Sequence, residues 1–346
     1  RRFLRSKERT PDSFLLNSPA PRRGDSTSEE KRKSDFSRIL SFQSRNHQYL
    51  GVIFLISFLL LKLSQDTSYT RKEVQVELQT IALLAALGCC TGFLAGLLGI
   101  GGGMIMTPFL IMLIPASLIP HDHIVHVAIA TSLATITFTS ISSVRAHHKR
   151  GAVLWNVVAS VAPGILLGAL LGAQIASLLS TFWISLIFCC FVGFSAFKMF
   201  MNKPPKADRE LPGNIGRIFV GTIIGVLSAL VGAGGGFISV PWMIWCNVKM
   251  HNAVATSAAL GFPIALFGTM GYIISGWNVQ GLPQWPIDIG YICIPALFAL
   301  AIPSVLLAPV GAKVAHSIDV KPLKKCFACL LCCICVYMLR QAYLAW

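Results

Sequence analysis

Long stretches of this chain contain almost no charged residue, which limits the folds it can adopt more than any other feature. Residues 81–144 contain a single Asp, Glu, Lys or Arg residue, Asp122. Further runs without any such residue cover 152–197, 218–248, 250–287, 289–312 and 326–339. Charged residues make up only 12% of the chain, against roughly a quarter in soluble domains. Within lipid every backbone polar group must be paired internally, so these runs predict membrane helices and an all-α polytopic membrane protein.

The first 47 residues differ in character from the rest of the chain. They contain twelve Lys or Arg residues and six Asp or Glu residues, together with many Ser and Pro residues. Such a segment buries too little apolar surface to fold alone. We predict a disordered basic tail over 1–47, followed by a short N-terminal helix or anchor and a loop over 48–80. The apolar run in that region, Tyr49–Leu61, would span about 20 Å as a helix, less than a bilayer core.

Three clusters of basic residues indicate which loops face the cytoplasm. They lie at 145–150, around the linker at 198–217, and at 313–325. Lys and Arg accumulate in cytoplasmic loops, whereas Trp is enriched at the membrane interface. The loops at 177–183 and 277–286 lack basic residues and carry Trp, so we expect them outside. We expect an integral, multi-pass protein of the plasma (inner) membrane with its N-terminal tail in the cytoplasm.

A glycine motif occurs twice in the chain. Residues 99–103, Gly-Ile-Gly-Gly-Gly, are followed by Pro108. Residues 232–236, Gly-Ala-Gly-Gly-Gly, are followed by Pro241 at the same spacing. Glycine is a poor helix former, so three glycines in succession should break a long apolar helix. We take Pro108 and Pro241 as part of these helix breaks.

Two further segments recur downstream of the glycine motif. Segment 126–132 reappears at 251–257 with five of seven residues identical, and 172–174 resembles 311–313. The offsets between the copies are 133, 125 and 139 residues, so the copies differ in loop length. This pattern indicates duplication of one structural unit.

The two copies are predicted to have opposite orientations in the membrane. A helix over 81–113 would be about 50 Å long, too long for one crossing. If each broken segment forms a re-entrant hairpin, each copy contributes that hairpin plus three transmembrane helices. This odd number of crossings inverts the second copy, and two full crossings per broken segment would give the same sidedness. We expect repeat 1 over 81–201, a cytoplasmic linker over 202–214 and repeat 2 over 215–346. Inverted repeats with paired broken helices are typical of secondary transporters, with the site near the midplane.

The glycine breaks predict an anion site made by backbone groups. A helix that restarts within the membrane presents unpaired N–H groups and the positive end of its dipole, and such an end attracts anions. The deep segments lack the fixed carboxylates that a hard cation requires. Hydroxyl groups on the next helix of each copy would orient the anion, unless they bond to their own helix backbone. The expected substrate-binding residues are Gly101, Gly102, Gly103, Thr131, Ser132, Gly234, Gly235, Gly236, Thr256 and Ser257.

A histidine lies at the start of the second helix of each copy. A histidine side chain in water titrates near neutral pH, so His126 and His251 could gate the site or carry coupled protons. The alternative is that each caps its helix at the interface. A second alternative is a metal site, because His121, Asp122, His123 and His126 lie close in sequence. That cluster falls in an eight-residue expansion absent from the second copy, and we expect no bound metal.

The sequence argues against an enzyme. Met104 and Phe237 stand where a dinucleotide-binding fingerprint would require glycine, and no P-loop lysine follows. Ser-His-Asp catalysis would need a buried carboxylate that the apolar runs lack. Cysteines crowd 326–335 at spacings that a helix would distribute over several faces, so we expect small packing residues there. No cofactor and no nucleic-acid partner are expected.

The motifs resemble those of the sulfite exporter TauE/SafE family. The resemblance rests on Gly96–Pro108, His126–Ser132 and Phe138–Gly168, the last containing Arg145–Gly151 and Pro163-Gly164. It covers roughly 81–345 and leaves out the tail and first short helix. It implies export or uptake of sulfite, thiosulfate, sulfoacetate or another small organosulfur anion.

We therefore predict a secondary transporter of a small, sulfur-containing anion that works by alternating access. Its partners would be that anion and the lipid bilayer, and the sequence leaves a homo-oligomer open. One alternative is a transition-metal permease that uses the His121–His126 cluster with Met104, Met106 and Met112. The other is a membrane scaffold or sensor that transports nothing.

Overall fold

The computed structural model describes residues 71–99, 101–114, 122–201, 210–279, 289–315 and 321–344. The expected tail over 1–47 and the expected helix at Tyr49–Leu61 lie outside these residues. The described residues form ten α-helices and one isolated antiparallel bridge, between Ile289 and Ile292. The helices are α2 (Arg71–Leu98), α3 (Gly103–Leu113), α4 (Ile124–His148), α5 (Trp155–Leu178), α6 (Thr181–Met201), α7 (Asn214–Val231), α8 (Gly236–Trp245), α9 (Met250–Gly276), α10 (Ile294–Ala315) and α11 (Lys321–Leu344).

Seven of these helices are long and apolar enough to cross a membrane. They are the Gln79–Leu98 part of α2, and α4, α5, α6, α7, α9 and α10. Shorter apolar helices are α3, α8 and the Phe327–Tyr343 part of α11. Large apolar side chains such as Leu167, Phe219 and Ile274 are exposed on the outer faces of their helices, where they would contact lipid acyl chains. The prediction of an all-α, multi-pass membrane protein is confirmed.

Both long apolar segments are interrupted at their glycines, as the sequence predicts. Gly99, Gly101 and Gly102 separate α2 from α3 with φ between +66° and +75°. Gly232 and Gly235 separate α7 from α8 with φ of +69° and +74°. Residues with a Cβ adopt this left-handed conformation at a cost, whereas glycine adopts it freely.

The two prolines that the sequence pattern marks as helix breaks do not end a helix. Pro108 lies inside α3 and Pro241 inside α8, each five residues after the glycine that begins its helix. A proline removes one backbone N–H donor, yet both short helices continue past it. This corrects the expectation: the left-handed glycines set the break, and the prolines belong to the second half of each broken helix.

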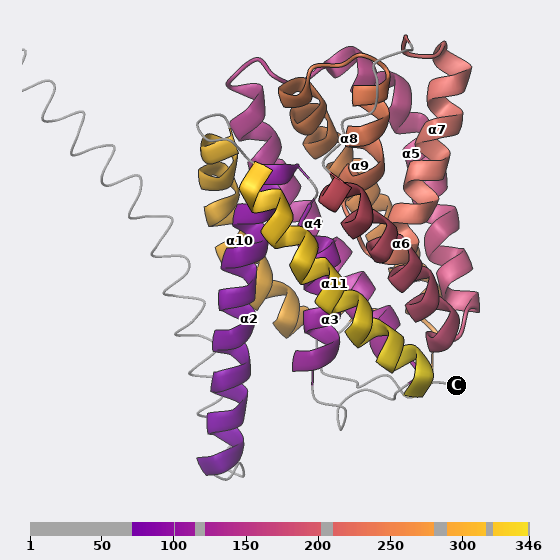
Figure 1. The fold of residues 1–346 in the computed structure, drawn as a ribbon. Coiled ribbons are helices and arrows are strands. Elements are labelled where there is room, and N and C mark those ends of the chain that lie inside the picture. The colour runs from indigo at the N-terminus through magenta and orange to yellow at the C-terminus, as the bar shows by residue number, and fades with distance from the viewer. Residues whose placement is uncertain are drawn as a thin grey trace, which may run out of the picture. The chain divides into compact units, whose positions relative to one another are not determined.

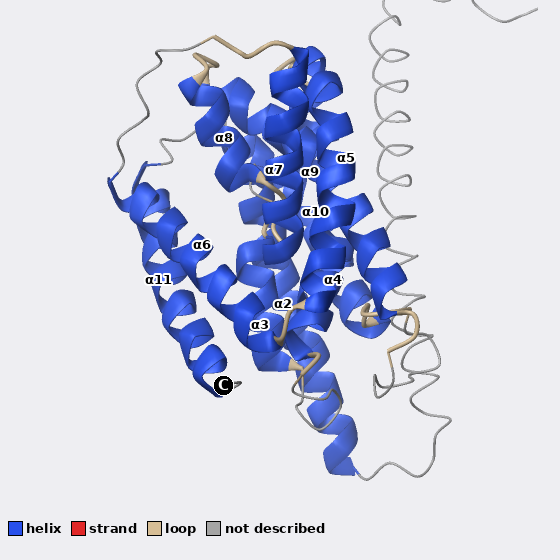
Figure 2. Cartoon of the chain, turned by 90° about the vertical axis from the view of Figure 1, so that its right-hand side faces the viewer, coloured by secondary structure: helices blue, strands red, loops and turns tan. Residues whose placement is uncertain are grey.

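The helices of the two copies pack in matching pairs (Figures 1 and 2). The first copy supplies α2–α6 and the second α7–α11. The most extensive contacts join α2 to α10 and α5 to α7, which are equivalent pairs under the duplication. Likewise α4 packs on α9, and α6 lies beside α11 in both views.

Small residues allow the main pairs to approach closely. Along α2, Gly88, Gly92 and Gly96 face the backbone of α10 at Leu300, Ser304 and Ala308. Along α5, the residues that face the α7 backbone at Ile218, Thr222 and Val226 are Gly164, Gly168 and Gly172. Such glycine faces at four-residue spacing are typical of membrane helix pairs.

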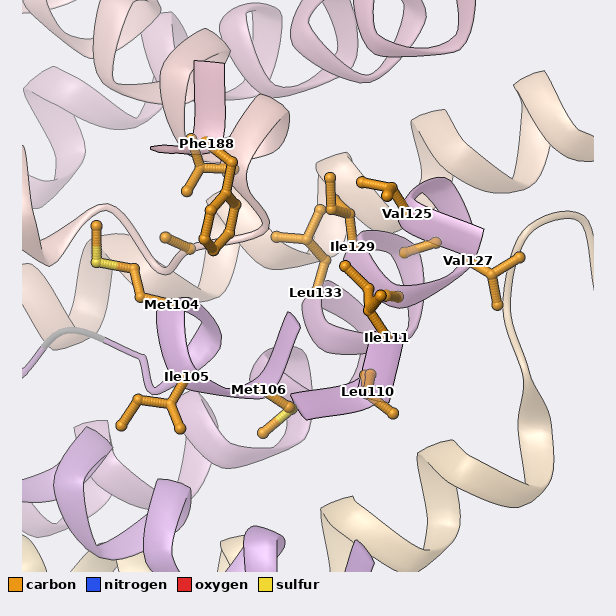
Figure 3. Close-up of a cluster of buried hydrophobic side chains, with 14 of the residues drawn as sticks. Met104, Ile105, Met106, Leu110, Ile111, Val125, Val127, Ile129, Leu133 and Phe188 are labelled. Atoms are coloured by element: carbon orange, nitrogen blue, oxygen red, sulfur yellow. The ribbon is translucent and has the colours of Figure 1, made fainter. Parts of the chain in front are cut away.

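The short helix α3 lies inside the protein. Figure 3 shows side chains of α3 and α4 packed together with Phe188 of α6. Met104, Leu110, Ile129 and Phe188 are each at most 1% exposed. This packing holds the start of α3, and with it the first glycine turn, in a defined position.

Candidate functional site

The two glycine turns touch each other in the interior of the protein. A Cβ placed on Gly101 would lie 2.8 Å from the Cα atom of Gly234. One placed on Gly103 would collide with the carbonyl oxygen of Gly232. The broken helices of the two copies therefore meet backbone to backbone, as the sequence argument for a shared central site requires.

Two serines link the copies across this contact. Ser132 Oγ on α4 donates to the carbonyl oxygen of Gly232 at 3.2 Å. Ser257 Oγ on α9 donates to the carbonyl oxygen of Gly99 at 3.0 Å. Each serine thus holds the glycine turn of the other copy, and each bond satisfies a carbonyl at the end of a broken helix.

The neighbouring threonines also bond across the copies. Thr131 Oγ1 accepts from the Cys293 N–H at 3.1 Å, immediately before α10. Thr256 Oγ1 accepts from the Leu154 N–H at 3.0 Å, immediately before α5. In this conformation all four hydroxyls of the Thr-Ser pairs are therefore engaged with backbone groups of other segments.

A third pair of bonds follows the same duplication. His147 Nε2 lies 3.1 Å from the carbonyl oxygen of Gly96. At the equivalent positions of the second copy, Tyr272 Oη donates to the carbonyl oxygen of Ala229 at 3.1 Å. Different side chains thus perform the same task, which is to hold the last turns of α2 and α7.

A narrow pocket lies where the two glycine turns meet α4 and α9. In this conformation it has room for about one water molecule. The lining residues are Ala95, Gly99, Gly101, Thr139, Ser140, Ser143, Gly234, Ala258 and Gly261. Gly101 and Gly234 were expected from the sequence. The three hydroxyl residues of α4 were not, because they have no counterpart in the second copy.

The electrostatic character of this region comes from the backbone. Helices α3 and α8 both begin at the contact between the turns, and neither has an acidic residue in its first turn. The first amides of a helix lack intrahelical partners, and the helix dipole is positive at that end. The positive ends of both helices therefore lie beside the pocket, an arrangement that favours an anion.

The two histidines at equivalent positions have different environments. His126 is buried, with Nε2 3.1 Å from the Ala176 carbonyl oxygen and its ring stacked on Tyr291 at a centroid distance of 5.3 Å. The His123 ring lies 6.1 Å from that of His126. His251 is exposed. Neither histidine is among the residues that line the pocket, and His126 is separated from the pocket residue Ser143 by about 25 Å along α4.

The structure describes only part of the alternative metal-binding set. Within the described ranges, no group of three or more His, Cys, Asp or Glu side chains could hold a metal ion. His121 lies outside those ranges, and Asp122 is exposed. Met104 and Met106 are buried in the core, whereas Met112 is 56% exposed.

These features define a class of protein. Seven potential membrane spans, two matching sets of helices and a central pocket between two broken helices are those of a membrane transporter. The family model of the sulfite exporter TauE/SafE matches residues 84–338, and the chain belongs to this family.

Similar proteins occur in bacteria and archaea. A probable membrane transporter protein of Haemophilus influenzae is 32% identical over 259 residues, which cover 75% of this chain and 97% of that protein. A probable membrane transporter protein of Methanocaldococcus jannaschii is 27% identical, covering 75% of this chain and 95% of that protein. No solved structure matches the chain.

Proposed function

We propose that this protein is a secondary carrier of a small sulfur-containing anion, such as sulfite, thiosulfate or an organosulfonate. The pocket between the glycine turns carries this proposal, because both helix starts that adjoin it are positive and lack acidic side chains. Backbone amides of Gly101–Gly103 and Gly234–Gly236 would bind the anion. Thr131, Ser132, Thr256 and Ser257 would position those turns and, in another conformation, contact the anion.

Alternating access in this proposal follows from an inverted arrangement of the two copies. A Cβ on Gly261 would lie 4.0 Å from Ser140, and a Cβ on Gly268 would lie 3.0 Å from Leu133. From the first contact to the second, the residue number increases along α9 and decreases along α4, so these equivalent helices run antiparallel. This supports opposite orientations of the copies. The basic loops and the tail would then face the cytoplasm, in the plasma membrane.

Transport in proteoliposomes tests the proposal. We expect the purified protein to accelerate the flux of sulfite, thiosulfate or a sulfonate such as sulfoacetate at least tenfold over empty vesicles. Sulfate, chloride and Zn²⁺ serve as comparison solutes. Movement of Zn²⁺ without movement of any sulfur anion would instead indicate a metal permease. If no solute moves although the protein is folded in the vesicles, a scaffold or sensor is the better description.

A pH gradient should separate the roles of the two histidines. His126 is the stronger candidate for proton coupling, because it is buried whereas His251 is exposed. The titratable rings that face it are His123 and Tyr291. We expect His126→Gln to reduce the stimulation of flux by an imposed pH gradient at least fivefold, and His251→Gln to preserve it. Unchanged stimulation in the His126 variant, with normal unfolding temperature, would remove His126 from the mechanism.

A further inference from the structure

The hydroxyl side chains of the central pocket all come from one copy. Thr139, Ser140 and Ser143 lie on α4. The offset of 125 residues places Ile264, Ala265 and Gly268 at the equivalent positions of α9, and none of these carries a hydroxyl. The duplication that explains the glycine turns therefore does not explain the polar wall of the pocket.

The opposite side of the contact between the turns is filled. The pocket residues Ala258 and Gly261 have Leu133 and Ile136 as their equivalents on α4, and both are fully buried. A Cβ on Gly103 would lie 2.7 Å from Ile136 Cδ1, so the Ile136 side chain packs directly against the first glycine turn. The pocket is therefore one-sided. Its α4 wall carries the hydroxyl side chains of Ser140 and Ser143, whereas the positions related to the pocket by the duplication carry apolar side chains or glycine.

Of the three hydroxyl residues that line the pocket, Ser143 is the one whose hydroxyl has no hydrogen-bond partner among the described residues. Thr139 Oγ1 donates to the Thr135 carbonyl oxygen at 3.0 Å and lies 2.9 Å from Ser304 Oγ. Ser140 Oγ donates to the Thr137 carbonyl oxygen at 3.0 Å. Ser143 is 3% exposed, and its Oγ has no hydrogen-bond partner among the described residues. Helical serines usually bond back to their own helix, and a buried hydroxyl without a partner is unfavourable.

We propose that Ser143 donates a hydrogen bond to the transported anion and, with Ser140, makes the binding site one-sided. This inference rests on the proposed function and names the residue that fixes the orientation of the anion. The glycine-turn amides would bind one face of an oxyanion, and the Ser143 O–H would bind an oxygen on another face. A hydrogen bond to a charged acceptor is stronger than a neutral one, so its loss should be measurable.

The test compares Ser143→Ala with Ser185→Ala in proteoliposomes. Ser185, on α6, matches Ser143 in burial and also has an Oγ without a partner among the described residues, but it does not line the pocket. We expect Ser143→Ala to raise KM for the transported sulfur anion about tenfold or more, and Ser185→Ala to leave it within twofold. Ser143→Cys, which keeps the shape of the side chain but is a weak donor, should resemble Ser143→Ala and guards against a folding defect in one variant.

The same measurements distinguish failure of this inference from failure of the proposed function. A wild-type protein that moves no sulfur anion overturns the proposed function and, with it, this inference. A wild-type protein that transports, together with Ser143→Ala and Ser143→Cys variants of unchanged KM, overturns the role of Ser143 alone. Equal losses in the Ser143 and Ser185 variants would show a general packing effect and would also overturn it.

Discussion

Replacing Gly101 with alanine is expected to reduce the proposed anion flux at least tenfold while the protein still inserts in the membrane. Gly101 has φ of +75°, a conformation that costs a residue with a Cβ roughly 1–2 kcal/mol. The added Cβ would also lie 2.8 Å from Gly234 Cα and 3.1 Å from Gly234 N. These are backbone atoms, so the two turns would have to separate at the place where the pocket is formed.

Gly151 provides the matched control for this variant. It has a similar backbone conformation, with φ of +65°, but nothing lies within 4 Å of the position that its Cβ would take. Gly151→Ala should therefore cost the backbone strain alone and leave flux within about twofold. Flux assays normalised to the amount of folded, reconstituted protein make the comparison. Equal activity of the two variants would mean that close contact between the turns is not needed for transport.

The position of the helix breaks could be predicted from the sequence because it depends on local chemistry. Glycines at 99, 101 and 102 adopt backbone conformations that other residues avoid, and the second copy repeats this at 232 and 235. The all-helical character of the membrane part follows from the lack of charge in the same way. These properties require no knowledge of which segments meet in space.

The partners of the Thr-Ser pairs could not be predicted in this way. The sequence shows the pairs twice, but Ser132 bonds to Gly232 and Ser257 to Gly99, across separations of 100 and 158 residues. A hydroxyl with a carbonyl or an amide in reach bonds to it wherever that group lies in the chain. Only the packing of one copy against the other shows that these hydroxyls hold the turns.

Part of the site could not be found by comparing the two copies in sequence. It draws attention to residues that recur, whereas Ser140 and Ser143 have Ala265 and Gly268 as their equivalents. The histidines show the converse: His126 and His251 recur in sequence, yet one is buried beside Tyr291 and the other is exposed. Duplication predicts the scaffold well, but the features that break its symmetry require the three-dimensional structure.

Adding one methyl group at Gly168 is expected to destabilise the folded protein by about 1–3 kcal/mol or more. The Cβ of Gly168→Ala would collide with the carbonyl oxygen of Thr222 on α7 and lie 2.9 Å from its Cα. Because these are backbone atoms, α5 and α7 must move apart along their whole contact. Membrane helices associate through close packing, not through exclusion of water, so the lost contacts are not replaced.

Gly193 provides the control for this prediction, because Gly193→Ala changes helix propensity without creating a clash with a neighbouring backbone. It lies within α6, and a Cβ there would make an ordinary contact of 3.5 Å with Cys335 Sγ. Alanine is better than glycine in a helix by about 1 kcal/mol, so Gly193→Ala should be neutral or stabilising. Gly92→Ala, in the equivalent pair α2 and α10, should lower the unfolding temperature in detergent as Gly168→Ala does. If Gly92→Ala and Gly168→Ala both unfold at the wild-type temperature, close backbone packing does not hold the two copies together.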